Sequence, residues 1–149
     1  MTDINDKIKT AWIRQLNEDW KTANFLYFNK SMRQPSFELA YSGVALGRWK
    51  GGCYRRLSIS IVLINTHAWE YVQEVLCHEM AHQYVEEVLG ICDELPHGEA
   101  FKRVCLEKGF DPTATGNIQT WMEKHKNRFT ASSENHQILD KVHKLLALA

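Results

Sequence analysis

The chain has 149 residues, of which 44% are hydrophobic and 24% charged, so it can fill one compact core and lacks the composition of a disordered protein. Its formal net charge is zero with histidine neutral, so the chain as a whole has no basic excess toward nucleic acid. No apolar run follows the first residues as in a signal peptide, and none approaches the roughly 18 residues of a membrane helix, so we expect a cytoplasmic, nucleoid-associated or nuclear protein that is not secreted and has no membrane partner.

The first half of the chain predicts a helix and two strands. In residues 7–29 apolar side chains recur at every fourth position, which is the period of a helix, and Gln34-Pro35-Ser36 interrupts that pattern. Strands are expected over 37–46 and 57–64, and the segment 47–52 between them has the glycine pair of a turn. We therefore expect the two strands to pair as a hairpin.

The second half predicts a long amphipathic helix and shorter ones after it. The long helix is expected to follow an N-cap at Asn65 or Thr66 and to stop at Gly90. After a loop, a shorter helix is expected over 98–108, and Asn117 is a candidate cap for another. The apolar stripe of the long helix consists of residues four apart, namely Val72, Leu76, Met80, Tyr84 and Val88.

The last segment, residues 135–149, has the pattern of a strongly amphipathic helix. Burying an apolar side chain gains ~1.5–3 kcal/mol, so such a stripe is expected to dock on something. We expect residues 1–130 to form one domain and residues 131–149 to be a linker and a helix that begins a truncated second domain. A stop codon directly after Ala149 in the coding sequence would contradict this expectation.

Residues 78–82 read His-Glu-Met-Ala-His and match the H-E-x-x-H motif. Residues four apart on a helix turn through ~400° and project from one face, so His78 and His82 can bind one metal ion. Neutral imidazoles suit Zn²⁺, and Glu79 is placed to face a metal-bound water as a general base without ligating the metal. The alternative is that both histidines are core residues hydrogen-bonded to the backbone.

A catalytic zinc needs three protein ligands and one open position. His97 is the best candidate for the third ligand, because a helix returning antiparallel to the first would bring the start of that helix beside the motif. The alternative for His97 is an ordinary residue in the first turn of a helix. Glu86 or Glu99 could orient an imidazole from outside the ligand set, although the helix dipole alone explains an acid at position 99.

These residues resemble the SprT-like (Spartan-like) domain family. The likeness rests on residues 78–82 and, after fourteen further residues, on His97-Gly98-Glu99-Ala100-Phe101, which fits the family's H-G-x-x-F pattern. Residues 46–50 and 57–60 are similar to the hairpin before the family's active-site helix, and the likeness covers roughly residues 8–110. The ending is similar to the opening of a small bacterial and phage domain of unknown function.

The resemblance implies an α+β, minimal zincin-like fold in which a small sheet packs beside the H-E-x-x-H helix. It implies a zinc metallopeptidase that holds Zn²⁺ with His78, His82 and His97, uses Glu79 as the catalytic residue and acts on a protein or peptide. The family includes a eukaryotic DNA-dependent protease for DNA-crosslinked proteins, so single-stranded DNA, or DNA crosslinked to protein, is an expected partner. Many members carry a C-x-x-C zinc ribbon after this domain, and these 149 residues contain no such motif.

Two other functions fit the same motif. One is a DNA-associated adaptor with a structural zinc site and no catalysis, which would need a fourth protein ligand such as a cysteine near the motif. The other is a metallohydrolase of a different bond, because H-E-x-x-H does not name the bond.

Five residues around the expected hairpin are candidate nucleic-acid contacts, namely Arg48, Trp49, Lys50, Arg55 and Arg56. Basic side chains bind phosphate, and aromatic rings stack on unpaired bases. The alternative is a solvated sheet edge whose basic side chains prevent edge-to-edge aggregation.

Overall fold

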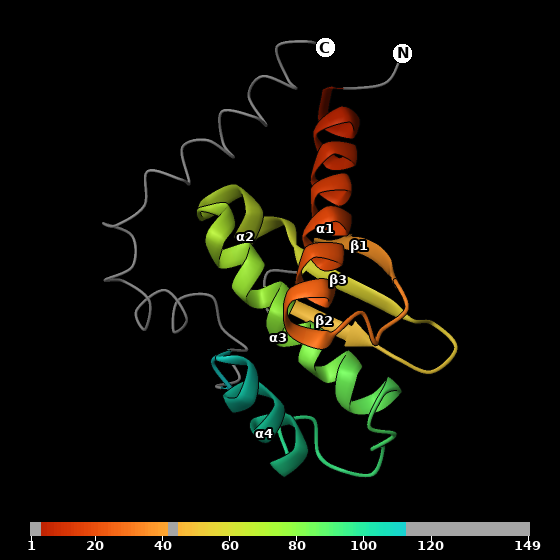
Figure 1. Cartoon of the computed structure of the whole chain (residues 1–149). Helices are drawn as coiled ribbons and strands as arrows, with labels where there is room; N and C mark the ends of the chain where they lie inside the picture. Colours follow the sequence, from red (N-terminus) through yellow and green to blue (C-terminus); the bar gives the residue numbers. More distant parts are fainter. Residues whose placement is uncertain (1–3, 42–44, 113–149) are drawn as a thin grey trace.

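The computed structural model describes residues 4–41 and 45–112, which form four helices and three strands (Figure 1). In chain order these are α1 (Ile4–Phe28), β1 (Ser36–Ala40), β2 (Gly47–Lys50), β3 (Arg56–Ser60), α2 (Ile61–Thr66), α3 (Trp69–Glu87) and α4 (Glu99–Lys108). The expected α+β class is confirmed. The helix expected after Asn117 and the segment 131–149 lie outside the described residues, so those expectations stay predictions.

The strands form a mixed sheet of order β1-β3-β2, and the expected hairpin between 37–46 and 57–64 is wrong. Strand β1 pairs with β3 in parallel, whereas β2, in the segment expected to be a turn, is the antiparallel partner of β3. The turn itself is confined to the residues after β2, where Gly52 has a φ of +62°, which favours glycine. Strands are predicted from the alternation of apolar and polar residues, and β2 has four residues with Trp49 as its one large apolar side chain. Its pattern was therefore too short to predict a strand.

One face of the sheet packs against the long helices. Leu39, Leu57 and Ile59 are buried in one core with the apolar side chains of α1 and α3. Glu38 and Ser58, which alternate with them, belong to the opposite face. Helix α1 contacts β1, and α3 contacts both β2 and β3, so β2 lies along the helix that carries the H-E-x-x-H motif (Figure 1).

The apolar run 61–64, expected to finish a strand, begins helix α2 instead. Ser60 is its N-cap, and the Ser60 hydroxyl oxygen accepts the N–H of Leu63 at 3.3 Å. A short continuous apolar run fits a buried strand or a buried helix, so this cap decides between them. Helix α3 begins at Trp69, and the N-cap expected for it at position 65 or 66 is therefore also wrong.

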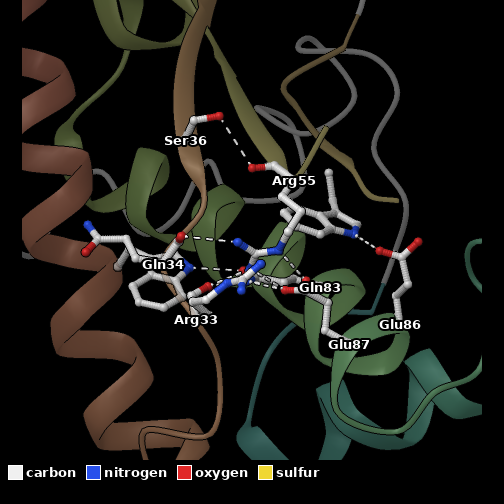
Figure 2. Close-up of polar contacts among 9 residues, drawn as sticks. Arg33, Gln34, Ser36, Arg55, Gln83, Glu86 and Glu87 are labelled. Atoms are coloured by element: carbon white, nitrogen blue, oxygen red, sulfur yellow. Dashed lines mark hydrogen bonds and ion pairs between the residues drawn. The ribbon is translucent and has the colours of Figure 1, made fainter. Parts of the chain in front are cut away.

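A polar network around the buried Gln83 fastens α3 to α1 and to the hairpin of β2 and β3 (Figure 2). Gln83 on α3 is fully buried, accepts the indole N–H of Trp20 at 3.1 Å and donates to the carbonyl of Arg33 at 3.0 Å. Gln83 also donates to Glu87 at 2.8 Å, and Glu87 in turn pairs with Arg55. These bonds fix the rotation of α3 about its axis, and hence the direction of its motif.

Helix α4 follows its sequence prediction within one residue. It ends at Gly109, which has a φ of +76° and donates its N–H to the carbonyls of Cys105 and Leu106. Among the described residues, no helix is both long enough and apolar enough to cross a membrane.

Candidate metal centre

Three histidines from two neighbouring elements converge beside the middle of α3. His78 and His82 lie one turn apart on α3, and His97 lies in the loop that leads into α4. One ligand nitrogen from each ring lies within 4.8 Å of the others, and the Nε2 atoms of His78 and His97 are 3.3 Å apart. Within residues 4–41 and 45–112, these three side chains are the group that could hold a metal ion.

The ring of Phe101 packs against all three imidazoles. Phe101 is 1% exposed and stacks on His82, with ring centroids 4.1 Å apart and planes 13° apart. It meets His78 and His97 edge-on, with centroid distances of 4.9 and 5.0 Å. Phe101 therefore orients the rings without offering a ligand atom. From the sequence it was only the last letter of H-G-x-x-F, although a spacing of four puts it one turn beyond His97.

An acid from the preceding loop caps the first turn of α4. Gly98 is the N-cap residue and has no side chain to offer, but Glu94 Oε2 accepts the N–H of Ala100 at 3.1 Å. A Cβ on residue 98 would lie 2.8 Å from that oxygen and 3.1 Å from the carbonyl oxygen of Leu95. Gly98 thus leaves room for the cap that fixes the helix end beside His97. This cap could not be predicted from the sequence, because Glu94 lies six residues before Ala100, whose N–H it accepts.

Burial keeps the three rings neutral. It lowers the pKa of His78 to about 4 and that of His82 to about 3, and it also lowers the pKa of His97. The Nδ1 atom of His78 lies 3.4 Å from the carbonyl oxygen of Asp111, so a proton on Nδ1 would leave Nε2 free as a ligand. Three neutral imidazoles with available lone pairs fit a zinc ion.

Glu79 lies in the same helical turn, held against strand β2. Its side chain is almost fully buried, and Glu79 Oε2 accepts the backbone N–H of Trp49 at 2.8 Å. Burial raises the pKa of Glu79 to about 7, although the Trp49 bond and the charge of Arg48 act in the opposite direction. A Cβ at Gly47 would lie 3.0 Å from Glu79 Cγ and 2.7 Å from Val75 Cγ1, so only glycine lets β2 come this close. No pattern in the sequence indicated this contact between strand and helix.

A cleft of about 780 Å³ contains the three histidines and Glu79. Its size is that of a ligand-binding site, and β2 and the loop before α4 contribute to its walls. Glu86, which was a candidate for orienting an imidazole, lines the cleft but accepts the indole N–H of Trp49 at 2.9 Å. Glu99, the other candidate, is exposed in the first turn of α4.

The five candidate nucleic-acid residues fall into two groups in the structure. Arg48 and Lys50 are exposed, and with Arg56 they alternate away from the helix-facing side of the sheet. Trp49 is half-buried and faces α3, through the bonds described above. Arg55 also turns inward and donates to both carboxylate oxygens of Glu87 at 2.5 and 2.7 Å.

We expect Arg55 to be a stabilising residue, so Arg55→Ala should lower the free energy of unfolding by about 1.5–3 kcal/mol. The side chains of Arg55 and Glu87 are only 17% and 24% exposed, so their ion pair is largely shielded from water. Arg55 also has a φ of +44°, a strained value for a residue with a side chain. Urea unfolding measures the loss. Arg56→Ala is the control, because its 3.4 Å pair with Glu38 is exposed and should contribute less than 1 kcal/mol.

The same pair predicts a pH dependence. The hydrogen bond from Arg55 lowers the pKa of Glu87, so the stabilisation is complete above the ordinary glutamate pKa and is lost as the pH falls through the lowered value. The difference between wild type and Arg55→Ala should therefore narrow in acid. A difference that stays constant down to pH 2 would contradict this role for the ion pair.

Two comparisons with known proteins found a match. The SprT-like family model matches residues 16–125, which include Glu79 and the three histidines. Protein SprT of Glaesserella parasuis serovar 5 (strain SH0165) is 32% identical over 97 residues, which are 63% of this chain and 58% of that protein. The chain thus spans little more than half the length of that relative. No solved structure matches the chain.

Proposed function

The chain belongs to the SprT-like family, and we propose that it is a zinc-dependent metallopeptidase that cleaves proteins bound or crosslinked to DNA. The observation that carries the proposal is the donor set. Among the described residues it comprises three neutral imidazoles and no cysteine, which suits a catalytic zinc better than a closed structural site. A buried carboxylate, Glu79, belongs to the same cleft, which makes hydrolysis the best-supported chemistry.

The residues have distinct roles in this proposal. His78, His82 and His97 would hold the zinc, which when bound supplies Lewis-acid polarisation of the scissile carbonyl and of water. Glu79 takes a proton from the attacking water and passes it to the leaving amine nitrogen. Since Oε2 of Glu79 already accepts the Trp49 N–H, Oε1 is the atom that we expect to carry this proton.

The test is a protease assay on the full chain together with its metal content. We expect about one zinc per chain and cleavage of an unfolded protein such as casein, with loss of cleavage in a chelator and recovery when zinc is restored. Assays with and without single-stranded DNA address the proposed link to DNA. Full zinc occupancy with no cleavage of casein or of DNA-crosslinked protein under either condition would favour the adaptor alternative.

One observation favours DNA contact at the exposed face of β2 and β3. Lys50 lies directly opposite Arg56 in the antiparallel pair, and like charges placed opposite each other destabilise a sheet. Arg56 also pairs with the exposed Glu38 at 3.4 Å, and a bound phosphate would relieve the repulsion that remains. Arg48, two residues from Lys50 on the same strand, is also exposed and extends the basic surface.

Lys50→Glu should therefore weaken DNA binding without destabilising the fold. It places opposite charges across the pair, which offsets the loss of the contact between the Lys50 ammonium and the Tyr54 ring, whose centroid is 4.1 Å away, so thermal stability should be about unchanged. It removes a phosphate contact, so single-stranded DNA should bind more weakly. The slope of log K against the logarithm of the salt concentration should become less steep by about 0.7–1. Fluorescence anisotropy over a salt series measures both. Lys7→Glu, with the same charge change at an exposed position of α1, is the control, and equal losses in the two variants would argue against a site on the sheet.

A further inference from the structure

Strand β2 is fastened to α3 at two points that lie on either side of Trp49. At Gly47 the strand approaches Glu79 closely, as described above, and at Gly51 a Cβ would overlap the carboxylate of Glu86. Neither glycine has a positive φ, so a side chain at either position would disturb the approach to α3 and not the backbone conformation. At Gly47 the nearest atoms belong to Val75 and Glu79, whereas at Gly51, directly after β2, they are the end of the flexible Glu86 side chain. The chain therefore contacts α3 on both sides of Trp49.

Trp49 makes one hydrogen bond at each of these points. Its backbone N–H donates to Glu79 Oε2 at 2.8 Å, and its indole N–H donates to Glu86 Oε2 at 2.9 Å, the bond drawn to Glu86 in Figure 2. Glu79 and Glu86 are seven residues apart, which is two turns, so their side chains leave the same face of α3. One residue of the strand thus bridges two turns of the helix, and one of the two carboxylates is the proposed general base.

We propose that Trp49 is a positioning residue for Glu79, anchored through its indole to Glu86. The anchor keeps the Trp49 backbone N–H at Glu79 Oε2, so the carboxylate presents one defined oxygen to the cleft. Small displacements of a reacting group carry large rate penalties, and a 1 Å error can cost about a hundredfold. The inference rests on the proposed hydrolysis, but the anchoring itself can be measured without any catalysis.

The variants separate the anchor from the bulk of the ring. Trp49→Phe keeps an aromatic ring and the backbone N–H but removes the indole donor, and Glu86→Leu removes the acceptor. Glu86→Gln keeps a carbonyl oxygen that can accept the same bond. The matched control is Trp69→Phe on α3. It also removes a hydrogen bond from an indole N–H to a carboxylate, in this case Asp19 Oδ2 at 2.5 Å.

We expect Trp49→Phe and Glu86→Leu each to lower kcat about tenfold with KM changed less than twofold, and the double variant to be no slower than either single one. Glu86→Gln should recover most of the loss seen in Glu86→Leu. Trp69→Phe should lower the melting temperature without lowering kcat. Additive losses, losses confined to KM, or no recovery in Glu86→Gln would show that Trp49 merely packs there, and would overturn the proposal.

Amide hydrogen exchange decides the question if the wild-type chain proves not to be a peptidase. The Trp49 amide should be protected in wild type, and its protection factor should fall about tenfold in Glu86→Leu but recover in Glu86→Gln. Unchanged protection of that amide in Glu86→Leu would overturn the anchoring. Absence of peptidase activity with this exchange pattern would refute the proposed function and leave the anchoring supported.

Discussion

Glu79→Gln is expected to keep its metal and its fold while losing on the order of a hundredfold or more of its peptidase turnover, the usual scale for removal of a general base. Glutamine has nearly the same shape and keeps a carbonyl oxygen, so it can still accept the backbone N–H that Trp49 donates. It cannot take a proton from water. The loss should therefore fall on kcat, because substrate binding in the cleft is left as it was.

Three measurements make this prediction specific. Zinc content equal to that of wild type shows that the histidine group is intact, and an unchanged melting temperature shows that the buried site tolerates the amide. Full turnover in Glu79→Gln would assign the base to another residue. Glu74→Gln is a matched control, since this carboxylate also lines the cleft but has no proposed part in proton transfer.

The parts of the site that lie close together in sequence were the ones that could be predicted. His78 and His82 share a helical face because of their spacing alone, and any helix through residues 78–82 would bring them together. His97 was found because the loop and helix after α3 have clear signals, and α4 ends at Lys108 as expected. These residues could be placed from the sequence because helix geometry depends on neighbouring residues.

The contacts made by β2 could not be predicted, because they depend on which strands pair. The pattern of residues 47–52 reads as a turn, yet four of them form the strand that donates to Glu79. Trp49 and Arg55 were grouped with the exposed basic residues, since sequence does not show which side of a short strand faces a helix. Both turn out to contact carboxylates of α3.

His97→Ala is expected to abolish stable zinc binding and, with it, the peptidase activity. Only the two histidines on α3 then remain as ligands. Removing a residue that merely hydrogen-bonds to a ligand lowers metal affinity roughly 10–100-fold, so the loss of zinc affinity on removing a ligand itself should be larger. A metal that binds only the folded state raises stability, by ~2.7 kcal/mol at a hundred times its Kd. Added zinc should therefore raise the melting temperature of metal-free wild type but not that of His97→Ala.

His97→Cys is the informative companion to that variant, because a thiolate is also a zinc ligand whereas a methyl group is not. It should recover part of the zinc-dependent rise in melting temperature. Metal analysis after dialysis gives the occupancy of all three proteins, and the thermal shift shows whether the metal is held by the folded site. Full zinc in His97→Ala, with the same thermal shift as wild type, would remove His97 from the ligand set. The convergence of ring nitrogens within 4.8 Å would then reflect only their shared packing around Phe101.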